Sequence, residues 1–135
     1  MNNKLIEKLT AYFNTTSEII AVYLFGSYAG GKEHPSSDID IGLLFNASDP
    51  SLIKEKTDTV MIDLSRILRK DIHPVILNLA GEELLRQIFL KGKCILDKNP
   101  KKLARFKMTT FSKIADFAYY KDQVQSGLIR NIMGD

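Results

Sequence analysis

Two short apolar runs flank a polar, glycine-rich stretch in the first third of the chain. The first run, residues 21–25, is continuous and stops at Gly26 and Ser27. The second begins at Asp38, and its large apolar residues recur at every second position: Ile39, Ile41, Leu43 and Phe45. Side chains of a strand alternate between faces, so this run predicts a strand with one buried face and with Asp38 and Asp40 together on the other. The pattern predicts two strands joined by a polar loop.

The remaining periodicities predict helices and two further strands. Helical spacing indicates helices over residues 3–14, 50–69, 81–91, 100–120 and 123–133. Shorter runs indicate strands over 71–78 and 94–96. Pro74 lacks a backbone N–H, which favours a sheet edge for its strand. The predicted fold class is α/β: a short mixed sheet backed by helices on one face, with the functional site on the open face.

Length and composition favour one globular domain. The chain has 135 residues, 44% of them hydrophobic, so we expect a single domain over 1–135, with 100–135 as a C-terminal helical extension. The net charge of +3 is too small to favour a nucleic-acid partner. The N-terminal residues lack the long apolar region of a signal peptide, and no apolar run approaches membrane-spanning length, so we expect a cytoplasmic protein without a membrane partner. The aromatic residues of the extension are candidates for packing on another chain, in a homo- or hetero-oligomer.

The residues around the polar loop carry the candidate chemistry. Two neighbouring carboxylates repel each other unless a cation lies between them, and Mg²⁺ prefers oxygen ligands of this kind. Asp38 and Asp40 are therefore candidate metal ligands. Gly26 permits a tight turn with close approach of a ligand, and Ser27, if it opens a short helix, offers a hydroxyl and free N–H groups to a phosphate. Such parts suit phosphoryl or nucleotidyl transfer.

The spacing of these residues resembles that of a known superfamily. Gly26-Ser27, ten further residues and Asp38-Ile39-Asp40 are similar to the motif of the nucleotidyltransferases related to DNA polymerase β, and specifically of their minimal MNT branch. Lys91-Gly92-Lys93 and the helical segment 106–119 extend the resemblance to the MntA-type antitoxins that accompany HEPN toxins. The resemblance implies a polymerase-beta-like nucleotidyltransferase fold.

The resemblance also implies a function. An MNT antitoxin of this type transfers AMP from ATP to a tyrosine of a cognate HEPN ribonuclease toxin and silences the toxin. By resemblance, Asp38 and Asp40 would hold two Mg²⁺ ions when ATP is bound, and Gly26 and Ser27 would bind the phosphates. The partners would be ATP and the HEPN-domain toxin.

His73 departs from the family pattern. Family members carry a third carboxylate on the next strand, as a metal ligand that helps to deprotonate the attacking hydroxyl, and the segment around His73 aligns with that position. His73 is therefore a third candidate catalytic residue beside Asp38 and Asp40. A neutral imidazole can act as a general base near pH 7, but it is a poor ligand for Mg²⁺. An exposed edge residue without a chemical role is an equally good interpretation of His73.

Two other functions remain open at this stage. A catalytically degenerate MNT antitoxin would neutralise its toxin by contact alone, which the His73 substitution motivates. A small-molecule nucleotidyltransferase is the other alternative, although enzymes of that kind usually need a second domain. The product of a neighbouring gene would discriminate between an antitoxin and a small-molecule enzyme, since the resemblance to the antitoxins predicts a small helical protein there.

Overall fold

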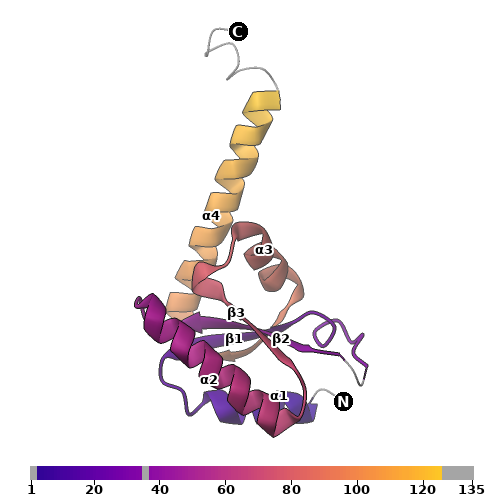
Figure 1. The fold of residues 1–135 in the computed structure, drawn as a ribbon. Coiled ribbons are helices and arrows are strands. Elements are labelled where there is room, and N and C mark those ends of the chain that lie inside the picture. Colours follow the sequence, from indigo (N-terminus) through magenta and orange to yellow (C-terminus); the bar gives the residue numbers. More distant parts are fainter. Residues whose placement is uncertain (1–2, 35–36, 126–135) are drawn as a thin grey trace.

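The structure, a computed structural model, describes residues 3–34 and 37–125. Figure 1 shows the helices and strands in these ranges. In chain order they are α1 (Asn3–Phe13), β1 (Ile19–Phe25), β2 (Ile39–Phe45), α2 (Pro50–Leu68), β3 (Ile72–Ile76), the short 3-10 helix η1 (Leu77–Leu79), α3 (Glu82–Lys91), β4 (Lys93–Asp97) and α4 (Pro100–Gln125). The elements expected up to residue 97 are all present, except that the strand expected over 71–78 ends earlier and continues as η1.

The strands form one mixed sheet in the order β3-β2-β1-β4. Strand β1 pairs antiparallel with β2 and β4, whereas β2 and β3 run parallel and are connected through α2. The mixed sheet and the edge position of the strand that contains Pro74 are confirmed. In the register of the sheet, Phe25 lies opposite Asp40 and Asp40 lies opposite His73. Three adjacent strands therefore converge around Asp40.

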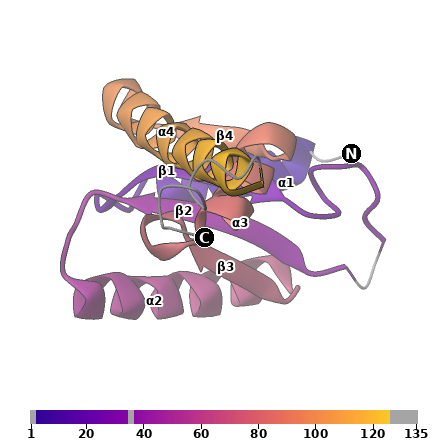
Figure 2. The same ribbon diagram turned by 90° about the horizontal axis from the view of Figure 1, so that it is seen from above.

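Helices cover both faces of the sheet, so the expectation of one open face is wrong (Figure 1, Figure 2). On one face, α1 and α2 enclose a core that contains Leu9, Leu64 and the alternating apolar residues of β2. On the other face, α3 and α4 pack over Tyr23 and Leu44. The reason is that β1 is buried on both sides, and a strand of this kind needs cover on each. The site lies at an end of the sheet instead.

Local sequence signals fix both ends of α2. Asp49 accepts a hydrogen bond from the backbone N–H of Ser51 at 3.0 Å, and Pro50 occupies the first turn. Arg69 adopts a left-handed conformation with φ 55° and ends the helix. The buried stripe of α2 is narrower than its apolar periodicity suggests, since Ile67 is 51% exposed.

Helix α4 continues without a break from Pro100 to Gln125, so the interruption expected near residues 121–122 is absent. The rest of the second expected helix, residues 126–133, lies outside the described residues. Figure 1 shows α4 extending well beyond the body of the domain. None of the described helices combines the length and apolarity needed to cross a bilayer.

The aromatic residues of α4 divide into two groups. Phe106 and Phe111 are half-buried and lie near the Phe89 ring of α3, with ring centroids 6.0 and 6.2 Å from it, and Phe106 packs against the core. Phe117 and Tyr119 lie farther along the helix and are 72% and 61% exposed. The first half of α4 is therefore a structural part of the domain, and the second half carries aromatic residues that are largely exposed.

Candidate active site

The backbone of Gly26 lies against the carboxylate of Asp40. Gly26 directly follows β1 and has φ +72°, a conformation that glycine adopts without steric cost. A Cβ atom added to Gly26 would lie 2.2 Å from Oδ2 of Asp40, far inside van der Waals contact. The sequence predicted a tight turn at this position. The structure adds that the Asp40 side chain occupies the space that a larger residue would need.

The loop after Gly26 consists of hydrogen-bonded turns. Ser27 therefore does not open a short helix, which was the arrangement in which we expected its N–H groups to bind a phosphate. The Gly30 N–H donates to the Gly26 carbonyl at 3.2 Å, and the Lys32 N–H donates to the Ser27 carbonyl at 2.9 Å. Ser27 is half-buried, whereas Tyr28 is 6% exposed and packs into the core on the α1 and α2 side. Tyr28 therefore anchors the loop, and the sequence signal for it was a single aromatic residue in a polar stretch.

His73 contacts Asp40 across the sheet. Its Nδ1 atom lies 3.2 Å from Oδ1 of Asp40, and the two side chains are 72% and 25% exposed. Strand β2 begins at Ile39, so Asp38 lies just before the strand. The alternation of side chains within a strand, from which we expected Asp38 and Asp40 to share one face, therefore does not apply to Asp38. Asp38 is exposed and lines a cleft together with His73 and Asp71. The structure thus brings the three candidate catalytic side chains to one end of the sheet, beside the loop.

The carboxylates of Asp38 and Asp40 are the candidate metal donors. No cluster of three His, Cys, Asp or Glu side chains within residues 3–34 and 37–125 could hold a metal ion by itself. Mg²⁺ is usually held by one or two carboxylates together with substrate phosphates and water, and seldom by a cage of protein groups alone. Two accessible carboxylates beside a glycine-rich loop therefore fit a magnesium ion that binds together with a nucleotide.

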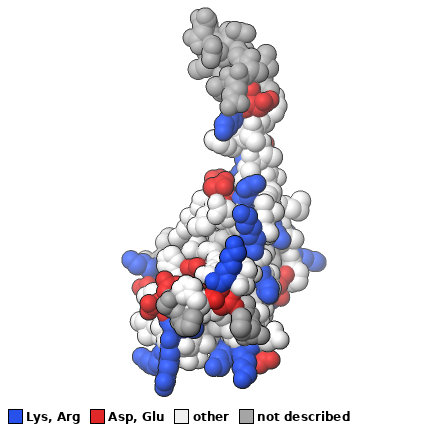
Figure 3. Space-filling model, turned by 90° about the vertical axis from the view of Figure 1, so that its right-hand side faces the viewer, with Lys and Arg blue, Asp and Glu red and all other residues white. Residues whose placement is uncertain are grey.

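The loop contains one further polar group that the sequence reasoning did not single out. Both carboxylate oxygens of Glu33 are buried and have no hydrogen-bond partner in the part of the chain that the structure describes. A buried carboxylate without a donor or a cation costs free energy. Figure 3 shows the side of the molecule on which the loop after β1 lies, and acidic and basic side chains are intermixed there. Glu33 therefore marks a point where a bound donor or cation would be stabilised.

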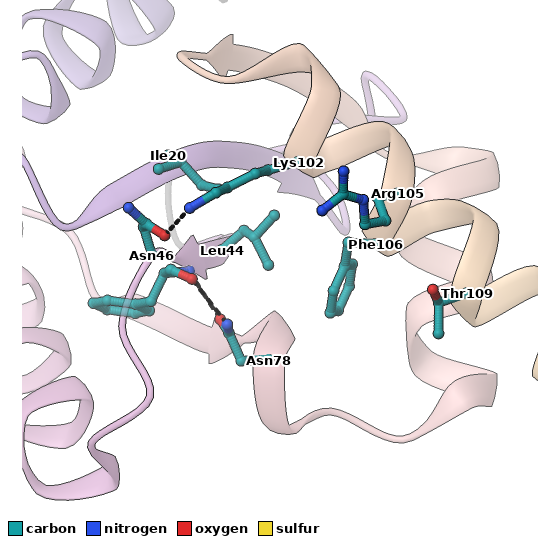
Figure 4. Close-up of a pocket in the computed structure, with 9 residues that line it drawn as sticks. Ile20, Leu44, Asn46, Asn78, Lys102, Arg105, Phe106 and Thr109 are labelled. Carbon is teal, nitrogen blue, oxygen red and sulfur yellow. Dashed lines mark hydrogen bonds between the residues drawn. The ribbon is translucent and has the colours of Figure 1, made fainter.

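A second hollow, of about 330 Å³, lies at the other end of β2 (Figure 4). Lys102 donates to Oδ1 of Asn46, and the Asn78 side chain exchanges two hydrogen bonds with the backbone of Phe45, at 2.8 and 2.9 Å. Arg105 and Phe106 complete the wall. Most of the polar groups drawn here bond to one another, so this hollow differs chemically from the end that contains Asp38 and Asp40.

The chain is similar in fold to solved toxin–antitoxin structures. One is a toxin–antitoxin crystallised with AMP-PNP, with 24% identity and a TM-score of 0.68 over 96% of this chain and 98% of that chain. Another is a tyrosine-to-alanine mutant of the toxin–antitoxin MntA-HpeT, with 27% identity and a TM-score of 0.63 over 99% and 98%. A third is the tri-AMPylated Shewanella oneidensis HEPN toxin in complex with MNT antitoxin, with 22% identity and a TM-score of 0.61 over 97% and 98%.

The sequence itself matches a protein family. A comparison with curated proteins gave no match. Residues 7–101 match the family described as "Polymerase beta, Nucleotidyltransferase", a segment that includes the glycine loop, both aspartates and His73. This segment is more than half of the 135 residues and spans the whole sheet. The chain therefore belongs to the polymerase beta nucleotidyltransferase family.

Proposed function

We propose that this chain is a cytoplasmic antitoxin that transfers AMP from ATP to a tyrosine of a HEPN-domain toxin and so neutralises the toxin. The observation that carries the proposal is the meeting of Gly26, which directly follows β1, with Asp40 of β2 and His73 of β3 at one end of the sheet. This arrangement leaves two accessible carboxylates beside a backbone loop, which are the parts that nucleotidyl transfer requires.

Each part has a proposed role. The loop from Gly26 to Lys32 holds the β- and γ-phosphates through the Ser27 hydroxyl and through backbone N–H groups other than those of Gly30 and Lys32, which bond within the loop. Asp38 and Asp40 hold Mg²⁺, which supplies positive charge that offsets the charge of the triphosphate. Tyr28 keeps the loop in place from the core side. Because little covalent chemistry is asked of the protein in such a transfer, positioning is its main contribution.

The similar structures support the choice of substrate and partner. One of them was crystallised with AMP-PNP, an analogue of ATP, and another contains a tri-AMPylated HEPN toxin bound to an MNT antitoxin. The present chain covers 98% of the length of both matched chains. The exposed aromatic residues Phe117 and Tyr119 on α4 supply a surface on which a partner protein would pack.

The proposal is tested with a double variant, Asp38→Asn with Asp40→Asn. Calorimetry of the unmodified chain should detect ATP binding with Mg²⁺ and none in EDTA. The double variant should lose Mg²⁺-dependent binding and AMP transfer while it unfolds at the same or a higher temperature, since two repelling charges are removed. Intact-mass spectra of the co-expressed toxin would report transfer directly. Equal ATP affinity in EDTA would overturn the metal assignment.

A contact-only antitoxin is the second candidate, and His73 is the observation that favours it. The residue opposite Asp40 is an imidazole that contacts Asp40, where the family carries a third carboxylate. Under this alternative, the toxin would remain unmodified yet fully neutralised when Asp38 is replaced by Asn. Neutralisation would instead be lost on replacing Phe117 and Tyr119 with Ser, if the exposed part of α4 is the docking surface. Truncation near Asp97 is a poorer test, because Leu103 of α4 is buried in the core.

A further inference from the structure

An open cleft of about 690 Å³ adjoins the candidate site between α2 and β3. His73 of β3 and Asp38, which directly precedes β2, line it on one side, and Met61, Ile62 and Arg66 line it from α2. We call this hollow the α2 cleft. It lies on the far side of Asp40 from the glycine loop, because the strands follow one another in the order β3-β2-β1 and the loop leaves β1.

The α2 wall of this cleft combines apolar and cationic groups. Ile62 is 53% exposed and Met61 is 37% exposed, although both stand beside carboxylates and an imidazole. Arg66 lies one helical turn from Ile62 and forms no ion pair within the described residues. Large apolar side chains left in solvent next to a reactive centre are typical of ligand contacts. The wall therefore suits an uncharged aromatic ring that is followed by a polar or acidic group.

The geometry of nucleotidyl transfer assigns a direction to each reactant. The attacking and leaving oxygens lie roughly in line on opposite sides of the reacting phosphorus. Under the proposed function, on which this inference rests, the leaving pyrophosphate is held by the loop beside β1. The attacking hydroxyl must then arrive from the opposite side, which is the side of β3 and the α2 cleft.

We infer that the α2 cleft is the acceptor site and that it takes a tyrosine side chain of a protein segment. The ring lies against Met61 and Ile62, and Arg66 contacts the adjoining peptide carbonyl or an acidic side chain. The phenolic oxygen forms a bond to the α-phosphorus of ATP as the bond from that phosphorus to the bridging oxygen breaks. Pyrophosphate leaves with the electron pair, and the phenolic proton passes to solvent water at the open cleft.

Binding is tested without catalysis by nuclear magnetic resonance. The full chain is saturated with Mg²⁺ and the α,β-methylene analogue of ATP, which cannot release pyrophosphate, and is titrated with N-acetyl-L-tyrosinamide. Amide resonances of residues 61–66 and 71–73 should shift. N-acetyl-L-phenylalaninamide, which lacks the hydroxyl, should shift the same resonances. No shift there at the solubility limit of the probe, or shifts confined to another surface, would overturn the assignment.

Kinetics with the same tyrosine probe and MgATP test the named residues. Ile62→Glu and Arg66→Glu should raise the KM for the probe about tenfold or more, with the affinity for MgATP unchanged, because only an acceptor contact is lost. Ile67→Glu is the matched control: Ile67 is on the same helix, is 51% exposed and does not line the cleft, so its KM should stay the same. An Ile62→Glu variant with weakened MgATP binding would make the cleft a nucleotide site and overturn the inference.

Failure of this inference is distinguishable from failure of the proposed function. Probe binding in the cleft without any AMP transfer would sustain the acceptor site and reject the enzyme activity. If the chain transfers AMP to the tyrosine probe and neither Ile62→Glu nor Arg66→Glu changes the KM, the enzyme activity is sustained and the acceptor site in the α2 cleft is rejected.

Discussion

The two ends of β2 both carry polar residues but use them differently. At its last residues, Asn78 pairs with both backbone groups of Phe45, and Lys102 bonds to Asn46. At its first residues, the carboxylates of Asp38 and Asp40 are accessible, and His73 is largely exposed. One end satisfies its polar groups within the chain. The other end keeps them available to ligands.

Unusual backbone conformations follow the same division. Gly26 and Gly31, both with positive φ, lie in the loop at the Asp40 end. At the other end, Lys98 donates from Nζ to the carbonyls of Phe13 and Thr16, each at 2.6 Å, and thereby closes the end of α1. Chains often hold unusual backbone conformations where they act on ligands. The contrast teaches that stability and function are separated along one strand, and this separation can be tested.

Gly26→Ala should have the largest effect. The new Cβ would meet Oδ2 of Asp40 at 2.2 Å, and the left-handed backbone would also be strained, so we expect MgATP binding and AMP transfer to become undetectable. Gly31→Ala is the control, because Gly31 has φ +69° but no atom within 4 Å of an added Cβ. It should cost about 1 kcal/mol of folding free energy. Calorimetry measures MgATP binding and thermal unfolding measures stability. An effect seen in both variants reports backbone strain, and an effect seen only in Gly26→Ala reports the clash with Asp40.

His73→Asp should change activity in the opposite direction. A third carboxylate next to Asp40 would add an oxygen donor for Mg²⁺, and we expect AMP transfer to rise roughly tenfold to a hundredfold. The unmodified chain should depend on Mn²⁺ more than this variant, since imidazole suits transition metals better. Rates with each metal and intact-mass spectra of the toxin measure the effect. A variant no faster than the unmodified chain in either metal would leave His73 without a role at the site.

Asn78→Ala tests the closed end of β2. The N–H and C=O groups of Phe45 would lose their side-chain partner, so the free energy of unfolding should fall by about 1–2 kcal/mol. Asn46→Ala removes only an exposed contact with Lys102 and should cost less. Urea unfolding measures both. The affinity for MgATP should remain unchanged, and a parallel loss of affinity would contradict the separation of the two ends.

Tyr23→Phe should have the smallest effect, which appears only in alkali. Burial, together with the neighbouring Cys94 and Asp97, raises the pKa of Tyr23 to about 12. Because the unfolded state ionises near the ordinary pKa of about 10, this stabilisation is complete below pH 10 and is lost as the pH rises toward 12. The unfolding free energy of Tyr23→Phe should therefore fall less steeply over this interval.

Tyr12 provides an independent comparison for that measurement. Burial and a hydrogen bond from its hydroxyl to Asp63, at 2.7 Å, also raise its pKa above the ordinary value. Tyr12→Phe should reduce the alkaline slope too, and the double variant should reduce it further. Identical slopes for the unmodified chain and Tyr23→Phe would show that Tyr23 ionises freely in the folded protein.

Much of the fold follows from patterns that are local in the sequence. Alternation in β2, the cap at Asp49 and the missing donor of Pro74 each specify a structure without reference to distant residues. Local patterns did not predict that the second face of the sheet is covered. That cover depends on α3 and α4, which pack over Tyr23 and lie far from it in the sequence. Helical spacing alone would place Ile67 in the buried stripe of α2, but Ile67 is 51% exposed, since the width of that stripe is set by how α2 meets the sheet.

The candidate site shows the same limit. Gly26, Ser27, Asp38 and Asp40 stand close together in the sequence, so their spacing was sufficient to single them out. The contact between His73 and Asp40 joins residues 33 positions apart and needs the register of β2 with β3. The α2 cleft is formed across the edge of the sheet, and no local pattern around Ile62 indicated it.

Strand β3 has a consequence for the behaviour of the protein at high concentration. Edge strands with free backbone groups recruit strands of other molecules and so promote aggregation, and short strands interrupted by proline resist this. β3 has five residues, includes Pro74 and forms one edge of the sheet. The strand that carries His73 is therefore a poor template for a neighbouring chain. Under the proposed function, an end of the sheet that must stay open to a protein acceptor would gain both solubility and access from Pro74.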